Sequence, residues 1–332
     1  MQIGEPLLME PLYFSYVWGA PNQKSWIASR FGRQIPPEVE PVAESWEIVA
    51  LDRTLTNRIL NYPRSQATLF EVLERDPEAI LGILDQSKRF PFIVKYLEIF
   101  DRLSVQVHPD DATAERLGFG PFGKSEAWLI LEATPEARIW AGFAREVSRP
   151  IVEDAIKSGE VVTLLREHIP HPGDFYHFPA GTIHAAQGRL LVAEVQEASQ
   201  LTFRIFDWNR TGKDGQPRPL HVAEALESIA YRGEFVEPVN VFTELRNSPD
   251  QRLVRFRRFA VRHRQIAFPL TIPLEGQYSV ICLLQGRLKV TVPSCELDVQ
   301  AGQTFLIPAT IPSVTFSPGG GPVPSLLEIR PK

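Results

Sequence analysis

Short apolar runs broken by glycine and proline dominate the chain, and most of them have the composition of β-strands. Residues 90–100, FPFIVKYLEIF, form a nearly continuous apolar run, which is typical of a buried strand. The run LSVQVHPDD follows directly, and EAWLILEA comes after the polar loop ATAERLGFGPFGK. Further strand-like runs are LLVAEVQEAS, LTFRIFDW, YSVICLLQGRLKVTVP and TFLIPATIPSVTF. The pattern therefore predicts a mainly β protein.

A few segments have helical periodicity instead. They lie near residues 68–82, 148–168 and 220–230. Thr68 and Glu71 have the spacing of a capping box, which predicts that the first helix starts at Thr68. Pro77 is expected to end or kink that helix, and Gly159 to split the second segment into two short helices. From about residue 234 to the C-terminus no helical period appears.

The stretch PGDFYHFPAGTIH, which ends at His184, has the most distinctive spacing in the chain. Its aromatic run is typical of a half-buried strand, and a tight turn follows in which Gly181 can adopt a positive φ. The pattern G-x5-P-x-G-x2-H resembles the second half of the signature of the cupin superfamily. In that superfamily the histidine is a metal ligand inside a small β-barrel, so the resemblance implies this role for His184.

A second copy of this spacing occurs near the C-terminus. The spacing of the motif from Gly173 to His184 is repeated, position for position, from Gly302 to Ser313. Thr310 takes the place of the turn glycine, and Ser313 takes the place of the histidine. Such self-similarity predicts a duplicated fold unit. The alternative is that a turn common in β-barrels recurs by chance.

We therefore predict a mainly β fold of two cupin (jelly-roll) β-barrels with a small helical segment. Residues 1–232 would form the catalytic domain, including the helical pieces, and residues 233–332 a degenerate cupin-like barrel. Because Ser313 replaces the ligand histidine, we expect a single metal ion per chain.

Composition and charge restrict the partners of the protein. The 332 residues are 44% hydrophobic and 23% charged, which is ordinary for a soluble globular protein. A net charge of -5 with dispersed basic residues predicts no nucleic-acid or membrane partner. Cys282 and Cys295 are too few for a disulfide framework, and the N-terminus lacks the pattern of a signal peptide. We expect a cytoplasmic protein, and nothing in the sequence indicates an obligate protein partner.

Four polar residues on the predicted strands form a candidate metal site. Gln106 and His108 are two apart, so in a strand both side chains face the same side. Glu126 begins the next strand after a loop, and His184 follows the glycine turn. Two histidines, one acid and a weak amide ligand suit a catalytic zinc ion. Taken singly, His108 could be a turn histidine, Gln106 a surface residue and Glu126 a solvated acid.

Several motifs together resemble type I phosphomannose isomerase. They are YVWGA, AESWEI, FPFIVKYLEIFDRLSVQVHPDD, GKSEAW, PAGTIHA and AEVQEASQLTFRIFDW, and they cover most of residues 10–230 in the order of the family. The resemblance implies a zinc-dependent cupin enzyme that interconverts mannose 6-phosphate and fructose 6-phosphate, with its small-molecule sugar phosphate as partner. The family's metal ligands fall on the four residues of the candidate site.

The resemblance also implies three catalytic residues, Lys124, Glu194 and Arg204. A sugar phosphate needs a cationic clamp, and isomerisation through an enediolate needs a base and a charge that stabilises the developing oxyanion. Which residue has which role stays open. Lys124 could be a solvated loop lysine, Glu194 a salt-bridged strand acid, and Arg204 a partner of Asp207 or Glu194.

The sequence departs from the family at Gln200, where an acidic residue is usual. This change leaves the metal ligands in place but alters the sugar-facing rim. Three alternatives to a mannose 6-phosphate isomerase therefore remain at this stage. They are an isomerase of a different sugar, phosphorylated or unphosphorylated, a non-catalytic sugar-phosphate binder, and a cupin oxidoreductase that uses iron or manganese.

Overall fold

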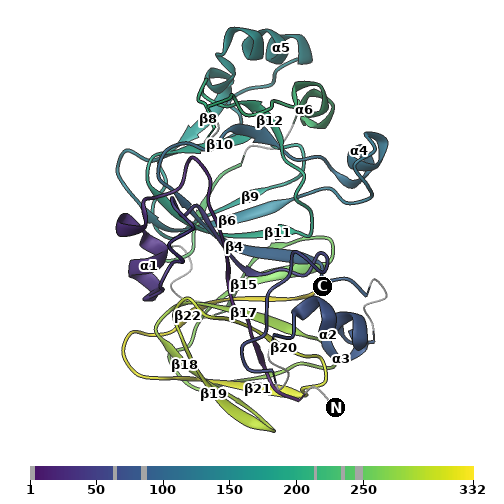
Figure 1. Cartoon of the computed structure of the whole chain (residues 1–332), viewed down its shortest axis with the longest axis vertical. Coiled ribbons are helices and arrows are strands. Elements are labelled where there is room, and N and C mark those ends of the chain that lie inside the picture. Colours follow the sequence, from purple (N-terminus) through teal and green to yellow (C-terminus); the bar gives the residue numbers. More distant parts are fainter. Residues whose placement is uncertain (1–3, 63–65, 84–87, 213–214, 233–235, 244–249) are drawn as a thin grey trace. The chain divides into compact units, whose positions relative to one another are not determined.

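A computed structural model describes residues 4–62, 66–83, 88–212, 215–232, 236–243 and 250–332 (Figure 1). The chain divides into two compact units. The central unit contains Tyr13–Ser45 and Lys95–Glu244, and the terminal unit contains the described parts of Met1–Leu12, Trp46–Val94 and Leu245–Lys332. The sequence predicted two consecutive domains divided after residue 232. In the structure, residues before that point contribute to both units.

Two antiparallel sheets build the central unit. The larger has the strand order β13 (Val239–Asn240), β9 (Asp174–Phe178), β6 (Glu126–Ala133), β11 (Leu190–Glu197), β4 (Phe92–Ile99), β3 (Glu44–Ile48) and β2 (Leu12–Phe14). The smaller has the order β12 (Phe203–Phe206), β5 (Val105–Val107), β10 (His184–Gln187), β7 (Arg138–Phe143) and β8 (Leu165–His168).

Alternating side chains give the smaller sheet two different faces. On β5, Val105 and Val107 pack in a buried cluster with Leu226 of α6 (Val222–Ser228), and Figure 1 shows α6 beside β12. Gln106 lies between the two valines, so its side chain points to the opposite face. A second buried cluster, which includes Trp128 of β6, fills the space inside the two sheets. The polar residues of the candidate site therefore point inward.

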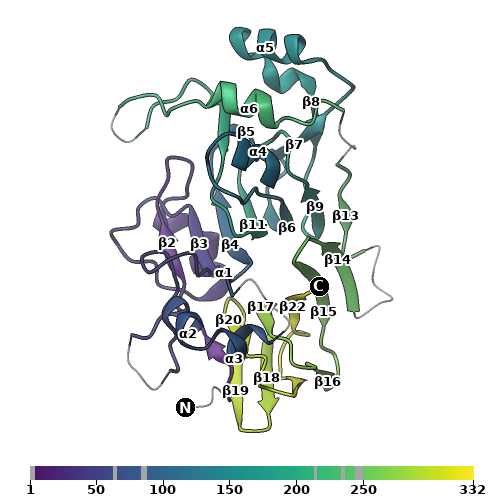
Figure 2. The ribbon, with the colours of Figure 1, turned by 90° about the vertical axis from the view of Figure 1, so that its right-hand side faces the viewer.

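The terminal unit repeats this strand order. One sheet has the order β1 (Leu7–Leu8), β20 (Thr304–Ile307), β17 (Ser279–Gln285), β22 (Ser325–Pro331), β15 (Phe259–Gln265) and β14 (Asp250–Arg255). The other has the order β16 (Leu270–Pro273), β21 (Ser313–Pro318), β18 (Arg287–Val292) and β19 (Cys295–Gln300). Figure 2 shows β15, β17 and β22 side by side. The predicted pair of cupin-type β-barrels is confirmed.

Most of the predicted helical boundaries are confirmed. The helix α2 (Leu69–Arg75) starts with the expected capping box, in which Glu71 N donates to Thr68 Oγ1 at 3.2 Å. It ends before Pro77, where α3 (Pro77–Leu81) begins. The helix α5 (Arg149–Ser158) ends at Gly159, which has a φ of 77°, and a 3₁₀ turn (Val161–Leu164) follows.

Some helical predictions are wrong. Residues 165–168 form β8, because pairing with β7 overrides the local helical pattern. The polar loop after His108 contains α4 (Asp111–Arg116), whose start is capped by Asp110 accepting from Thr113 N at 2.7 Å. The helix α1 (Trp26–Phe31) and the 3₁₀ turn before it (Asn22–Lys24) were not predicted.

Two further sequence expectations concern cysteines and membranes. Cys282 and Cys295 form no disulfide bond, and Cys282 is buried. Among the residues that the structure describes, no helix is both long and apolar enough to cross a membrane.

Candidate metal centre

Strand register places three polar residues in a row on the smaller sheet of the central unit. His184 of β10 lies opposite Gln106 of β5, and Arg204 of β12 lies opposite Gln106 on its other side. Directly opposed residues of antiparallel strands present their side chains to the same face. All three side chains therefore belong to the inner face, and only their alternating apolar neighbours face the helices.

Both histidines are oriented by backbone carbonyl groups. His108 Nδ1 lies 2.7 Å from the carbonyl oxygen of Leu201, and His184 Nδ1 lies 2.9 Å from that of Thr182. Because a carbonyl oxygen only accepts hydrogen bonds, each Nδ1 carries the proton. In the neutral rings each Nε2 is then left with a lone pair. A backbone or carboxylate partner on the far nitrogen is typical of metal-binding histidines.

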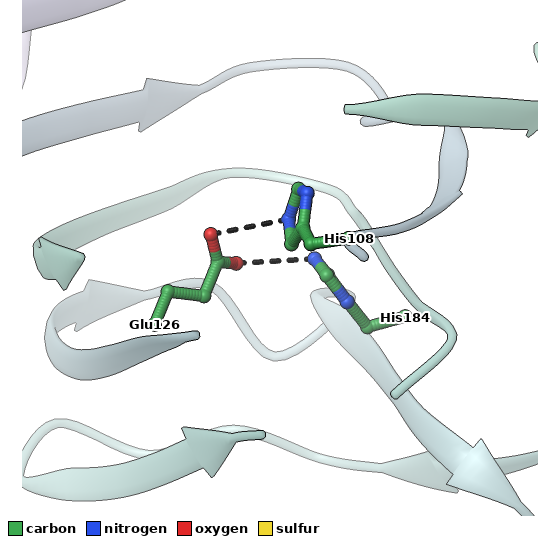
Figure 3. Close-up of side chains that lie close together, drawn as sticks. All are labelled: His108, Glu126 and His184. Atoms are coloured by element: carbon green, nitrogen blue, oxygen red, sulfur yellow. Dashed lines mark ion pairs between the residues drawn. The ribbon is translucent and has the colours of Figure 1, made fainter. Parts of the chain in front are cut away.

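Glu126, the first residue of β6, faces both lone pairs (Figure 3). Its Oε2 lies 3.2 Å from His108 Nε2, and its Oε1 lies 3.1 Å from His184 Nε2. All three side chains are buried, and their ligand atoms lie within 4.8 Å of one another. Apart from these contacts and an ion pair between Glu126 Oε2 and Lys124, neither carboxylate oxygen nor His108 Nε2 has a hydrogen-bond partner among the described residues. Buried polar atoms are rarely left so, and a divalent cation would satisfy all of them.

The protonation states suit a cation. Burial and the nearby charge of Lys124 lower the pKa of His108 to about 4, so its ring is neutral at pH 7. Burial acts to raise the pKa of Glu126, but Lys124 and His108 outweigh it and hold the pKa well below the usual value. His108 therefore offers a neutral imidazole and Glu126 a carboxylate, which are the forms that bind metals.

Lys124 is part of this cluster. Its Nζ lies 2.7 Å from Glu126 Oε2, and its side chain is 6% exposed, so the alternative of a solvated loop lysine is wrong. The preceding Gly123 allows this approach, because a Cβ there would lie 2.4 Å from the carbonyl oxygen of Pro109. Lys124 N donates to that same oxygen at 2.9 Å.

Gln106 is next to the cluster but presents its amide nitrogen. Gln106 Nε2 lies 3.2 Å from His184 Nε2, while Ser104 Oγ lies 3.4 Å from Gln106 Oε1. Half a turn of the terminal amide would bring the oxygen to the position of the nitrogen. Gln106 is therefore placed to be a fourth ligand only in that orientation.

Glu194 lies one strand away, on β11, within a second group of buried charges. Its Oε2 accepts from Trp128 Nε1 at 2.8 Å, and its Oε1 lies 3.6 Å from Lys95 Nζ. Lys95 Nζ is also 3.5 Å from Glu44 Oε2. Burial and the charge of Glu126 raise the pKa of Glu194, whereas the carboxylates raise the pKa of Lys95 although burial lowers it. The charge of Glu126 contributes to the raised pKa of both Glu194 and Lys95, so this group interacts electrostatically with the candidate metal centre.

The sequence reasoning missed Lys95 and Glu44 as members of the site. A signal was present, because Lys95 is the one cation inside the apolar run of β4. A lysine within a strand that is buried on both faces needs an internal partner. Nothing in the sequence alone identified Glu44 as that partner, because β3 and β4 are far apart in the chain.

Arg204 pairs with neither of the two carboxylates that the sequence suggested as its partners. Among the described residues it forms no ion pair with Asp207 or Glu194; instead its Nη1 donates to the carbonyl oxygen of Pro219 at 3.0 Å. Its Nε is buried without a hydrogen-bond partner. Burial and the charge of Arg218 lower its pKa. Arg204 thus lies beside Gln106 with donors to spare.

The fold and the His–Glu–His cluster define a cupin-type protein with a candidate metal centre. Residues 7–120 match the catalytic domain of phosphomannose isomerase type I. The chain is 32% identical to the mannose-6-phosphate isomerase ManA of Bacillus subtilis, over 92% of this chain and 93% of the relative. It is 27% identical to a mannose-6-phosphate isomerase of Streptococcus mutans, over 95% and 96% of the two chains.

A solved structure agrees with these similarities. The crystal structure of the mannose 6-phosphate isomerase from Bacillus subtilis has a TM-score of 0.81 at 26% identity, covering 98% of this chain and 99% of that chain. The chain belongs to the type I phosphomannose isomerase family, as its motifs predicted, and it is an isomerase.

Proposed function

We propose that the chain interconverts mannose 6-phosphate and fructose 6-phosphate and uses one zinc ion per chain as its cofactor. Family membership and the names of the relatives support this reaction. We also place the enzyme in the cytoplasm, since free cysteines suit a reducing compartment.

We assign the zinc ion to His108, Glu126 and His184, with the Gln106 amide oxygen as a weaker fourth ligand. The observation that carries this assignment is the convergence of two imidazole lone pairs on one buried carboxylate. When bound, the ion supplies a fixed positive charge next to the sugar oxygens on which negative charge develops. Sites made only of oxygen ligands favour other metal ions, whereas two imidazoles and one carboxylate favour zinc.

The chain's own residues would then handle the proton and the rest of the charge. Isomerisation removes a proton from the carbon next to the carbonyl group and returns it to the neighbouring carbon, through an enediolate. We assign Glu194 to this proton transfer, because its raised pKa brings the proton-holding form closer to neutral pH and its Oε1 has no hydrogen-bond partner among the described residues. Lys124 would stabilise the developing oxyanion, and Arg204 would bind the anionic end of the substrate.

A coupled assay tests the proposal. Purified, zinc-loaded protein is mixed with mannose 6-phosphate, and fructose 6-phosphate is measured with and without a chelator. We expect formation of fructose 6-phosphate that the chelator abolishes and added zinc restores. Turnover that is insensitive to a chelator, after metal analysis confirms that zinc has been removed, would refute the metal dependence. No turnover by folded, zinc-loaded protein would refute the substrate, and turnover of unphosphorylated sugars would identify a replacement.

A further inference from the structure

Two arginines pair with one carboxylate near Arg204, beside the candidate metal centre. Asp207 follows β12 directly and is 5% exposed. It accepts from Arg218 through both oxygens, with Arg218 Nε donating to Oδ2 at 2.7 Å. Arg210 Nε and Nη2 also donate to Oδ1, at 3.2 and 2.9 Å. Asp207 therefore holds two guanidinium groups in fixed orientations, which is a stronger restraint than a single surface ion pair provides.

The two arginines differ in what they have left to donate. Arg210 also reaches Asp101 Oδ2 through Nη1 at 3.4 Å, so all three of its nitrogens have partners. Arg218 uses only Nε and Nη2, and its Nη1 has no partner among the described residues. Arg210 therefore serves to fix Asp207, and Arg218 is the arginine that can bind something else.

Arg204 contacts the chain segment that carries Arg218. Its Nη1 donates to the carbonyl oxygen of Pro219, the residue after Arg218, and its Nε is buried without a partner. Tyr16 lies nearby as well: burial and Glu44 raise its pKa to about 12, while Arg204 and Arg218 act in the opposite direction. The Tyr16 hydroxyl is thus within electrostatic reach of both arginines and of Glu44, which contacts Lys95 of the buried charge group.

The charges of this region do not balance. Arg204, Arg210 and Arg218 face two carboxylates, Asp207 and the more exposed Asp101, so a positive charge remains uncompensated. The spare donors belong to Arg204, which shares a face of the sheet with Gln106 and His184, and to Arg218, whose neighbour Pro219 accepts from Arg204. Guanidinium groups bind phosphate in a bidentate manner, and a phosphate dianion would compensate the surplus charge.

We propose that Arg218, positioned by Asp207, forms with Arg204 the clamp that binds the phosphate group of the substrate and so selects phosphorylated over free sugars. This inference rests on the proposed function, in which Arg204 alone was assigned to the anionic end. It adds Arg218 as a binding residue and Asp207 as a positioning residue.

The test compares Arg218→Ala, Arg218→Lys and Asp207→Asn with wild type. Each protein is loaded with zinc and checked for folding by circular dichroism. Binding of inorganic phosphate is measured by calorimetry, and KM and kcat are measured with mannose 6-phosphate. A charge-assisted hydrogen bond contributes enough for roughly a tenfold effect. We therefore expect at least about a tenfold rise in the phosphate Kd and in KM for Arg218→Ala, with a smaller change in kcat.

The other variants separate binding from positioning. Arg218→Lys keeps the charge but loses the fork geometry, so we expect it to recover only part of the affinity. Asp207→Asn keeps Arg218 but loosens it, and should raise KM in the same direction by a smaller factor. Arg149→Ala is the matched control, because Arg149 is also paired with carboxylates, Glu153 and Glu227, but lies on α5. It should leave the phosphate Kd unchanged.

Failure of this inference differs from failure of the proposed function. If folded Arg218→Ala binds phosphate and mannose 6-phosphate as wild type does, Arg218 is not part of the clamp, although the isomerase can stand. If wild type binds phosphate through Arg218 but never isomerises mannose 6-phosphate, the clamp stands and the proposed reaction falls. If Arg218→Ala does not fold, the phosphate Kd of Arg218→Lys decides: a Kd equal to that of wild type overturns the bidentate clamp.

Discussion

The two barrels have the same strand order but differ in the polar residues at corresponding positions. The order β9-β6-β11-β4-β3 in the central unit corresponds to β20-β17-β22-β15-β14 in the terminal unit, and β5-β10-β7-β8 corresponds to β16-β21-β18-β19. The register makes the match specific. Glu126 pairs with Phe178 as Ser279 pairs with Ile307, each just before the proline of the repeated motif.

The same correspondence places three of the four ligand positions of the central barrel in the terminal one. Ser279 stands where Glu126 does, and Ser313 where His184 does. Pro273, opposite Ser313, stands where Gln106 does. The terminal barrel therefore lacks the donor set at the corresponding positions. Among the described residues, the cluster of the central barrel is the one group of His, Cys, Asp and Glu that could hold a metal ion.

One buried carboxylate is kept in both barrels, and it shows what distinguishes a structural group from a functional one. Glu328 lies opposite Ile281 as Glu194 lies opposite Trp128. Glu328 accepts from Arg264 Nε at 2.6 Å and from Ser279 Oγ at 3.3 Å, so both oxygens have partners. Glu194 Oε1 has no hydrogen-bond partner among the described residues. At these corresponding positions, the carboxylate of the terminal barrel is fully paired, whereas that of the central barrel keeps an oxygen that a substrate could use.

The largest expected effect contrasts these two carboxylates in activity. Glu194→Gln should lower kcat by about 10²–10⁴-fold, the usual contribution of a general acid–base residue, with zinc content retained. The matched change, Glu328→Gln, should leave kcat of the folded protein within about twofold of wild type, since Glu328 contacts Arg264 and Ser279 of the terminal unit. Steady-state kinetics with metal analysis checks both. Equal losses of kcat in the two variants would contradict the assignment of a catalytic role to Glu194 and a structural role to Glu328.

The second effect concerns stability, for which Glu328 rather than Glu194 is the important carboxylate. Glu328→Ala removes the carboxylate that pairs with Arg264, and both side chains are buried. Removing one partner of a buried pair costs about 3–5 kcal/mol of the free energy of unfolding. Urea unfolding should show this loss for the terminal unit. An unchanged midpoint would mean that the pair contributes no net stability.

The third effect is a pH dependence of the terminal barrel. Burial lowers the pKa of His263 from 6.5 to about 4, and its Nε2 lies 2.8 Å from Ser325 Oγ. Between these values the unfolded chain binds a proton that the folded chain does not, so stability falls as pH decreases from about 6.5 to 4. The contribution is at most about 3 kcal/mol. His263→Gln should flatten the pH dependence of the unfolding midpoint, and an equally steep curve in the variant would assign it to other groups.

The smallest effect concerns the turn of the repeated motif. Gly181 has a φ of 89°, its N donates to the carbonyl oxygen of His108 at 2.8 Å, and a Cβ there would lie 3.0 Å from the carbonyl oxygen of Ser228. Gly181→Ala should cost about 1–2 kcal/mol and weaken zinc binding, because the backbone of a ligand would shift. At the matched position, Thr310→Gly should not affect zinc affinity. A competition titration with a zinc chelator measures both variants, and an unaltered affinity in Gly181→Ala would exclude the turn as a support of the site.

The sequence predicted the parts of this molecule that depend on local patterns. Alternation on β5 placed Gln106 and His108 on one face, and the spacing around Gly181 predicted the repeat. The division into units was not predictable in the same way, since segments before residue 95 join the barrel that ends at residue 332. Strand pairing between such distant segments leaves no local periodicity to read.

The charged groups show the same limit. Lys95 could have been noticed as a cation in an apolar strand, but its partners Glu44 and Glu194 come from other strands. Asp207 ends a strand-like run and Arg218 lies in the polar segment after it, and no local pattern pairs the two, so only the structure identifies the pair. Local sequence therefore identifies candidate residue types, while tertiary pairing decides which of them are left without a partner.

The most direct test of the contrast between the barrels is the zinc content of three purified proteins: wild type, His184→Ala and Ser313→Ala. We predict one zinc ion per chain in wild type and in Ser313→Ala. His184→Ala should contain almost none, although circular dichroism shows that it is folded. About two zinc ions per chain in wild type, or normal zinc content in folded His184→Ala, would contradict a single metal centre in the central barrel.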